Sequence, residues 1–169
     1  MKLSLIERES RDNVVDIWMK YHNNRNENVA YAISKKEYQK LTDRVKQSPM
    51  FLMPVKKNEN DGNHFMMIGQ GQEKTFMYTF LEDFKNNQTN AQPYFVLTIF
   101  DELLDKKDIA LVRGDIINYK IDKNQANMVL NYSLSSYLKD DLYNKFVYNF
   151  NHQTHEFSFD DFKSHFKLE

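Results

Sequence analysis

The spacing of apolar residues predicts that the first part of the chain is largely helical. Four apolar side chains occupy positions i, i+3, i+4 and i+7, which form one stripe along a helix: Val14, Ile17, Trp18 and Tyr21. The alternating residues 29–33 predict a short strand. Ser34 and Glu37 then match a capping box, in which each side chain binds the other residue's free backbone N–H, and Pro49 ends the helix that this box begins.

The middle of the chain follows the period of two that is typical of β-strands. Four segments are strand candidates: 50–55, 64–70, 74–80 and 94–100. The dipeptide Asp61–Gly62 predicts a turn between the first two. The segment 94–100 is apolar on both faces, which predicts a central strand that is covered on both sides. A buried run at 109–113 is expected to reach a turn at Gly114–Asp115 before a further strand at 116–120.

Helical spacing returns in the last third of the chain. Asp122 and Gln125 match a second capping box. The stripe that follows has five members: Ala126, Val129, Leu130, Leu134 and Tyr137. Another helix is predicted over 141–150, and Ser158 with Asp161 indicates a short terminal one.

These elements predict a single α+β domain over residues 1–169. Residues 1–48 form a helical N-terminal part, 49–121 a mainly sheet part, and 122–169 a helical C-terminal part. Strict alternation of strand and helix is missing, so we expect a central, mainly antiparallel β-sheet with the helices of both chain ends packed around it. A chain of 169 residues can bury a sufficient core without a disulfide or a metal.

Composition and charge exclude several classes of function. The 23 basic and 24 acidic residues give a net charge of −1, which argues against nucleic-acid binding. The absence of cysteine excludes thiolate zinc sites and cysteine nucleophiles. Four glycines leave little room for a phosphate-binding loop, and no apolar run approaches the ~20 residues that cross a bilayer. We therefore expect no cofactor, no nucleic-acid partner and no membrane insertion.

One cluster of polar residues could carry enzyme chemistry. His152, His155 and Glu156 lie close together in sequence, and histidines three residues apart on a helix can bind a metal with a carboxylate. The segment has no apolar periodicity and no third ligand at a recognisable spacing. A polar loop between helices is therefore the favoured interpretation. A small soluble hydrolase or metal-dependent enzyme that uses this cluster, or His64, is kept as the alternative.

Aromatic and methionine side chains are abundant. The chain has 13 Phe and 10 Tyr, together with 8 Met. Aromatic residues and methionine are enriched where proteins bind other proteins, and methionine adapts easily to a partner's surface. A Phe-rich core explains the same composition, and composition alone favours the core.

Seven short segments resemble a known family when they are taken in order and with their gaps. They are 17–21, 48–52, 64–70, 76–79, 109–115, 150–151 and 156–157. Together they resemble the mitochondrial assembly factors for the catalytic head of ATP synthase, specifically the chaperone of the beta subunit. The resemblance covers the chain from about Val14 to its C-terminus. One departure is Gly71, since the family tends to have Trp at that position.

The resemblance implies a non-enzymatic chaperone of the mitochondrial matrix. Such a protein would hold the free beta subunit until an alpha subunit displaces it, with no ATP hydrolysis of its own. We expect the free protein to be a monomer. Residues 1–12 carry both charge signs and no apolar run, so they do not read as a transit peptide. The expectation is that the chain is the mature core.

The expected contact is an apolar face that occupies part of the alpha subunit's binding site. The candidates are Phe65, Met67, Phe76 and Tyr78 from the sheet, with Trp18 and Tyr21 from the first helix. The two helix residues lie on the apolar stripe, so a core position is favoured for them. A rival enzyme would need a deep pocket with convergent polar groups. A general cytosolic adaptor is a further alternative.

Overall fold

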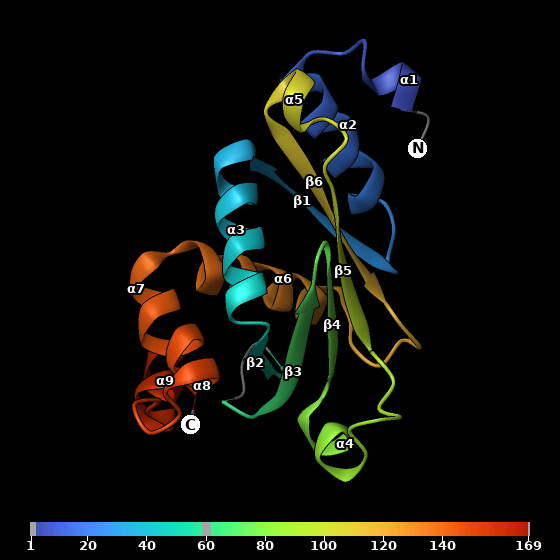
Figure 1. The fold of residues 1–169 in the computed structure, drawn as a ribbon. Helices are drawn as coiled ribbons and strands as arrows, with labels where there is room; N and C mark the ends of the chain where they lie inside the picture. The colour runs from blue at the N-terminus through green and yellow to red at the C-terminus, as the bar shows by residue number, and fades with distance from the viewer. Residues whose placement is uncertain (1–2, 59–61, 169) are drawn as a thin grey trace.

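The computed structural model describes residues 3–58 and 62–168, and its centre is a six-stranded antiparallel sheet (Figure 1). The strand order is β1-β6-β5-β4-β3-β2. The bounds of the strands are β1 Asn28–Ser34, β2 Met50–Lys56, β3 His64–Gln72, β4 Thr75–Phe80, β5 Phe95–Phe100 and β6 Ile109–Ile116. The α+β class with a mainly antiparallel sheet is confirmed. The predicted turn residue Asp61 lies outside the described residues.

The path of the chain uses both edges of the sheet before it fills the middle. After β1 the chain forms helix α3 (Lys35–Gln47) and starts again at the opposite edge with β2. Strands β2 to β6 then pair in sequence order, and β6 pairs with β1, where Asn28 lies opposite Asp115. Antiparallel neighbours need no long crossover, so the connections between β2 and β6 are turns, loops and short helices.

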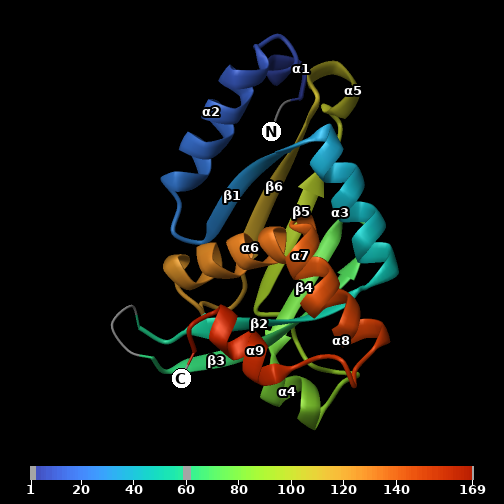
Figure 2. The same ribbon diagram turned by 90° about the vertical axis from the view of Figure 1, so that its left-hand side faces the viewer.

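Helices from both ends of the chain cover the sheet. Besides α3 the described part of the chain contains α1 (Leu3–Ile6), α2 (Arg11–Asn23), α4 (Leu81–Asn86), α5 (Leu104–Lys107), α6 (Lys123–Leu138), α7 (Asp140–Leu142), the π-helix η1 (Tyr143–Tyr148), α8 (Asn149–His152) and α9 (Phe159–His165). Helices α3, α6 and α7 to α9 gather on one side, and α2 runs beside β1 (Figure 2). No helix within the described residues is both long and apolar enough to cross a lipid bilayer.

At β1 and β6, two clusters of buried apolar residues lie on opposite faces of the sheet. The larger cluster joins the strands to α3, α6 and the C-terminal helices, and the smaller joins β1 and β6 to α2. Successive residues of a strand point to opposite faces. Leu111 of β6 therefore belongs to the smaller cluster and Val112 to the larger. The predicted buried run at 109–113 is confirmed, because this part of β6 is covered on both sides.

The predicted helix starts are confirmed by side-chain caps. Ser34 accepts from the Glu37 N–H, and the Glu37 carboxylate accepts from the Ser34 N–H at 2.8 Å. Asp122 and Gln125 form the same reciprocal pair at the start of α6. Ser158 accepts from the Asp161 N–H at 3.2 Å at the start of α9. Such caps satisfy N–H groups that a helix start otherwise leaves unpaired.

A buried polar network fixes the junction between α3 and β2. Ser48 is fully buried, and its carbonyl accepts a hydrogen bond of 2.6 Å from the Tyr137 hydroxyl. The Ser48 hydroxyl lies 2.9 Å from the Tyr143 hydroxyl and 3.2 Å from Nε2 of His152. These three partners come from α6, η1 and α8. The network therefore ties the junction to the C-terminal part of the chain.

Side chains close the sheet edge at β2. The Met50 N–H donates to Oδ1 of Asn151 at 3.1 Å, and Nδ2 of Asn151 donates to the Met50 carbonyl at 2.6 Å. Pro54 has no N–H, and Gln125 donates to the Lys56 carbonyl at 3.2 Å. An open edge strand invites pairing with another chain, and these contacts occupy or remove several of its free groups.

The predicted turn at Gly114–Asp115 is wrong. Strand β6 passes through both residues without a break, and the predicted strand at 116–120 is a turn after Ile116. A Cβ on Gly114 would lie 2.3 Å from the Phe95 ring. The glycine therefore makes room for an aromatic ring on the neighbouring strand.

The predicted helix over 141–150 is not one regular α-helix. Its centre is the π-helix η1, between α7 and α8. The wider turn places Tyr143, Phe146 and Val147 in the core, each at most 3% exposed. The simple stripe of Leu142, Phe146 and Phe150 that a 3.6-residue period predicts is therefore replaced by a broader buried face.

Replacing Tyr137 by Phe tests the polar network at Ser48. The variant Tyr137→Phe removes the donor to a buried carbonyl and keeps the ring, so we expect the free energy of unfolding to fall by about 1–2 kcal/mol in urea denaturation. The control Tyr31→Phe changes a side chain that is 45% exposed, and its effect should stay within about 0.5 kcal/mol. Equal effects of the two variants would contradict a stabilising role of the network.

Candidate partner-binding surface

Three of the six predicted contact residues lie in the larger core. Met67, Phe76 and Tyr78 are 0%, 3% and 1% exposed. The Tyr78 hydroxyl lies 2.6 Å from Oγ of Ser133 on α6. Burial raises the pKa of the Tyr78 phenol, although the bond to Ser133 acts in the opposite direction. These side chains attach the sheet to α6, and in this structure they offer a partner no accessible surface.

Phe65 is the one predicted sheet residue with accessible surface. It is half-buried on β3 and packs against the margin of the larger core. Its ring meets that of Phe80 edge to face, with the centroids 5.2 Å apart. Strand β3 lies next to the edge strand β2, so Phe65 is far across the sheet order from β1 and α2.

The two predicted residues on α2 point in different directions. Trp18 is 5% exposed, and its Nε1 donates to the Val112 carbonyl at 3.1 Å. Tyr21 is 54% exposed, and the Arg25 guanidinium lies 4.5 Å from its ring centroid. The structure therefore places Trp18 in the core and Tyr21 on the surface.

The buried positions of α2 are spaced four residues apart. Val14, Trp18 and His22 face the sheet, whereas Ile17 is 44% exposed and lies one turn before Tyr21. The predicted stripe is thus wrong for Ile17 and Tyr21. Residues four apart share one side of a helix, so these two form an exposed apolar strip, which we call the α2 strip. Ile17 is a surface residue that the sequence prediction assigned to the core.

A buried histidine helps to hold α2 on the sheet. Nδ1 of His22 lies 2.7 Å from Oδ1 of Asn28, and Nε2 is buried with no hydrogen-bond partner in the described structure. Burial lowers the pKa of His22 and outweighs the bond to Asn28, which raises it. Arg113 and Arg25 lower the pKa further, and Asp115 opposes them. The neutral imidazole is therefore the form that fits the folded protein.

The predicted histidine cluster does not assemble a catalytic site. Nε2 of His152 lies 2.8 Å from the Gln47 carbonyl and 3.2 Å from Oγ of Ser48. A carbonyl only accepts, so Nε2 carries the proton and cannot remove one from Ser48. His155 and Glu156 are exposed, with 3.6 Å between Nε2 and Oε1. Within residues 3–58 and 62–168, no group of three or more His, Asp or Glu is arranged to hold a metal ion.

Gly71 lies where helix α3 packs directly on the sheet. A Cβ added to Gly71 would come within 2.5 Å of Cγ1 of Val45 and 3.1 Å of Cε1 of Phe76. The tryptophan that the resembled family tends to have there does not fit on this backbone with α3 in place. The close packing of α3 on the sheet therefore explains why this chain has glycine at position 71.

Comparison with known proteins identifies the family. The sequence profile described as "ATP11 protein" matches residues 1–162. The chain belongs to the ATP11 family. A relative from Danio rerio with the name "ATP synthase mitochondrial F1 complex assembly factor 1" is 24% identical over 158 residues. The alignment covers 93% of this chain and 51% of the relative, so the chain spans about half the length of the curated relative it matches.

Membership of the ATP11 family supports part of the resemblance seen in the sequence. The zebrafish relative has the name of an F1 assembly factor, which is the class of protein that the seven segments resemble. Specificity for the beta subunit stays a prediction. The six contact residues also stay predictions as binding residues, and the structure adds only that Tyr21 and Phe65 are the accessible ones.

The pH dependence of stability tests the buried state of His22. Its pKa is lowered in the folded protein, so the unfolded chain takes up the proton first as the pH falls below about 6.5. We expect the free energy of unfolding to decrease from that pH downward, until the folded-state pKa is passed. The variant His22→Gln keeps a donor toward Asn28 and should flatten this part of the profile, measured by urea denaturation between pH 7 and pH 5.

The exposed His155 supplies the control for this prediction. The variant His155→Gln should leave the pH profile unchanged. A profile that is as steep in His22→Gln as in the wild type would show that His22 is not the titrating group.

Proposed function

We propose that this protein is a chaperone for assembly of the catalytic head of mitochondrial ATP synthase. It binds the free beta subunit in the mitochondrial matrix, shields the surface that later contacts the alpha subunit, and is displaced by that subunit. It hydrolyses no ATP and acts as a monomer. The observation that carries the proposal is the match to the ATP11 family over residues 1–162, together with the zebrafish relative's name.

The physical basis of the proposal is the apolar surface that an unassembled subunit exposes. Large apolar patches that await a neighbouring subunit aggregate when they stay uncovered. A small domain that covers such a patch prevents this, and an interface of standard size buries about 1,600 Å² in total. The chaperone must also be released from the beta subunit. The larger contact with the alpha subunit displaces it by mass action, because both compete for the same surface.

The α2 strip is our proposed contact with the beta subunit. Ile17 and Tyr21 are exposed on one side of α2, and aromatic side chains are enriched in protein interfaces. Arg25 beside Tyr21 adds a cation, and arginine is likewise enriched in interfaces. Val14 and Trp18 fix the opposite side of the helix to the sheet, so the strip is presented on a rigid element. Phe65 is a secondary candidate on the far side of the sheet.

The enzyme alternative is not proposed. It depended on the cluster of His152, His155 and Glu156, or on His64, which is half-buried at the start of β3 opposite Lys56. His152 uses Nε2 to bind the backbone of Gln47, and the other two side chains point into solvent as an exposed pair. No arrangement of these groups provides a nucleophile with its base.

Alanine variants of the α2 strip test the proposed contact. Ile17→Ala together with Tyr21→Ala removes two exposed apolar side chains from α2 and leaves the core untouched. We expect the dissociation constant for the isolated beta subunit to rise at least tenfold, because buried aromatic contacts in an interface are worth about 1–2 kcal/mol or more each. The measurement is isothermal titration calorimetry, with thermal unfolding as the check of the fold.

A second pair of exposed apolar residues provides the matched control. Met77 and Phe159 are 43% and 44% exposed but lie on β4 and α9. The double variant Met77→Ala with Phe159→Ala should bind the beta subunit with the wild-type affinity. Loss of binding in this pair and not in the α2 strip would show that the contact lies elsewhere.

A further inference from the structure

An open groove of about 490 Å³ lies where α3, α6 and the edge strand β1 meet. These three elements surround the same region in Figure 2, with β1 and α3 converging above α6. The apolar lining consists of Tyr31, Leu134 and Leu138. Tyr31 is 45% exposed, so its ring forms an accessible wall of the groove. Its volume is in the range of pockets that hold small ligands, which leaves room for one or two side chains of another protein.

The rim of the groove carries an excess of positive charge. Lys36, Lys40 and Lys139 line it with one acidic residue, Glu37, so three positive charges less one negative leave +2. The Glu37 carboxylate is already engaged in capping α3. The whole chain has a net charge of −1, so the local excess is not a consequence of a basic protein.

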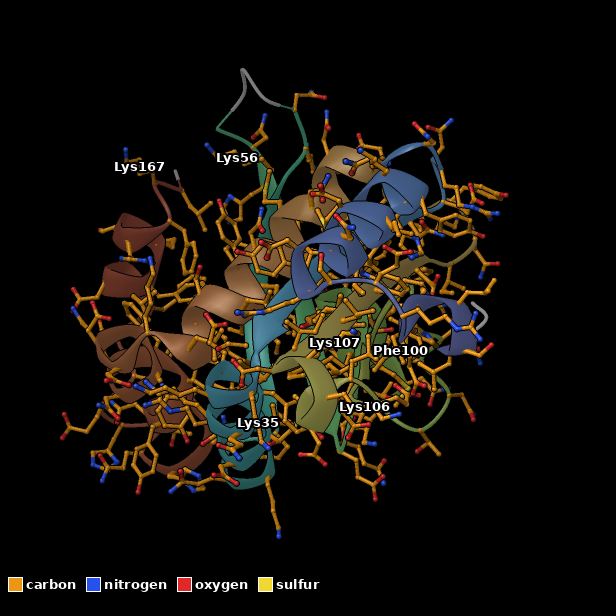
Figure 3. All side chains as sticks on the ribbon, turned by 90° about the horizontal axis from the view of Figure 1, so that it is seen from above. Lys35, Lys56, Phe100, Lys106, Lys107 and Lys167 are labelled. Atoms are coloured by element: carbon orange, nitrogen blue, oxygen red, sulfur yellow. The ribbon has the colours of Figure 1, made fainter. Side chains whose placement is uncertain are left out.

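Two of these lysines have no ionic partner in the described part of the chain. Lys40 pairs with Asp140 at 2.9 Å, whereas Lys36 and Lys139 are exposed and lack an ion pair there. Some other lysines are ion-paired. Lys35 and Lys106, near helix α5 in Figure 3, pair with Asp105 and Glu7, each at 2.8 Å. The groove therefore combines accessible apolar surface with cations that are available to a partner.

We propose that this groove binds an acidic segment of the client protein, the beta subunit. An apolar side chain of that segment rests on Tyr31, Leu134 and Leu138, and its carboxylates pair with Lys36 and Lys139. This inference rests on the proposed function. It adds a second, electrostatic anchor on the opposite side of β1 from α2. Complementary charges accelerate association and select the register of a complex, which suits a partner that must later be released.

Charge reversal at the rim tests the groove. The double variant Lys36→Glu with Lys139→Glu should raise the dissociation constant for the isolated beta subunit at least tenfold at low ionic strength, mainly through a slower association rate. Lys46→Glu with Lys167→Glu is the matched control, because it makes the same change in net charge at exposed positions on α3 and just after α9, outside both the groove and the α2 strip. The control should stay within about twofold of the wild type.

Zero-length coupling gives a second readout that does not depend on affinity. A carbodiimide activates a carboxylate, and a lysine Nζ in direct contact attacks the carboxyl carbon to form an amide. The activated oxygen leaves as part of the urea that the carbodiimide becomes. We expect Lys36 or Lys139 of the wild-type protein to couple to an Asp or Glu of the bound beta subunit, as read by mass spectrometry.

The outcomes separate this inference from the proposed function. If the wild-type protein does not bind the beta subunit, the proposed function fails and the groove assignment fails with it. If the wild type binds, and the groove variant binds as tightly as the wild type or no more weakly than the control, the groove assignment alone is wrong. Coupling only to lysines outside the groove would also overturn it.

Discussion

The structure depends on covering both faces of one antiparallel sheet. A six-stranded sheet with apolar side chains on both sides needs a layer on each. The C-terminal helices and α3 pack on one face, and α2 packs on the other over β1 and β6. Because α2 uses Val14, Trp18 and His22 for this task, its other apolar residues stay on the surface. The surface of α2 that is accessible to a partner therefore consists of the side chains that do not pack on the sheet.

The two ends of the chain are held together by buried polar contacts as well as by apolar packing. Ser48 connects the N-terminal part to α6, η1 and α8, and Asn151 closes the edge of β2. Breaking such a contact leaves a buried polar group unpaired, which is costly. The network therefore favours one arrangement of the helices and holds α3 and α6 in fixed positions relative to each other. The shape of the groove between them depends on these positions.

Local features of this fold were predictable from the sequence, whereas its surfaces were not. Capping at Ser34 and Asp122 needs only residues three apart, so the sequence contains all the information. The spacing around Trp18 identified a helix but not its buried side, because polar His22 takes a core position through its bond to Asn28. Strand order, the π-helix and the packing at Gly71 depend on contacts between distant segments. The groove could not be predicted for the same reason, since α3, α6 and β1 meet only in the folded chain.

In our proposal, this domain covers the free beta subunit and yields it to the alpha subunit. Size-exclusion chromatography of the domain with isolated beta subunit, before and after addition of alpha subunit, tests it most directly. We expect one co-eluting complex with beta, none with alpha alone, and release of the free domain when alpha is added. A domain that fails to elute with beta, or that stays attached to the assembled alpha–beta complex, would show that the proposed role is wrong.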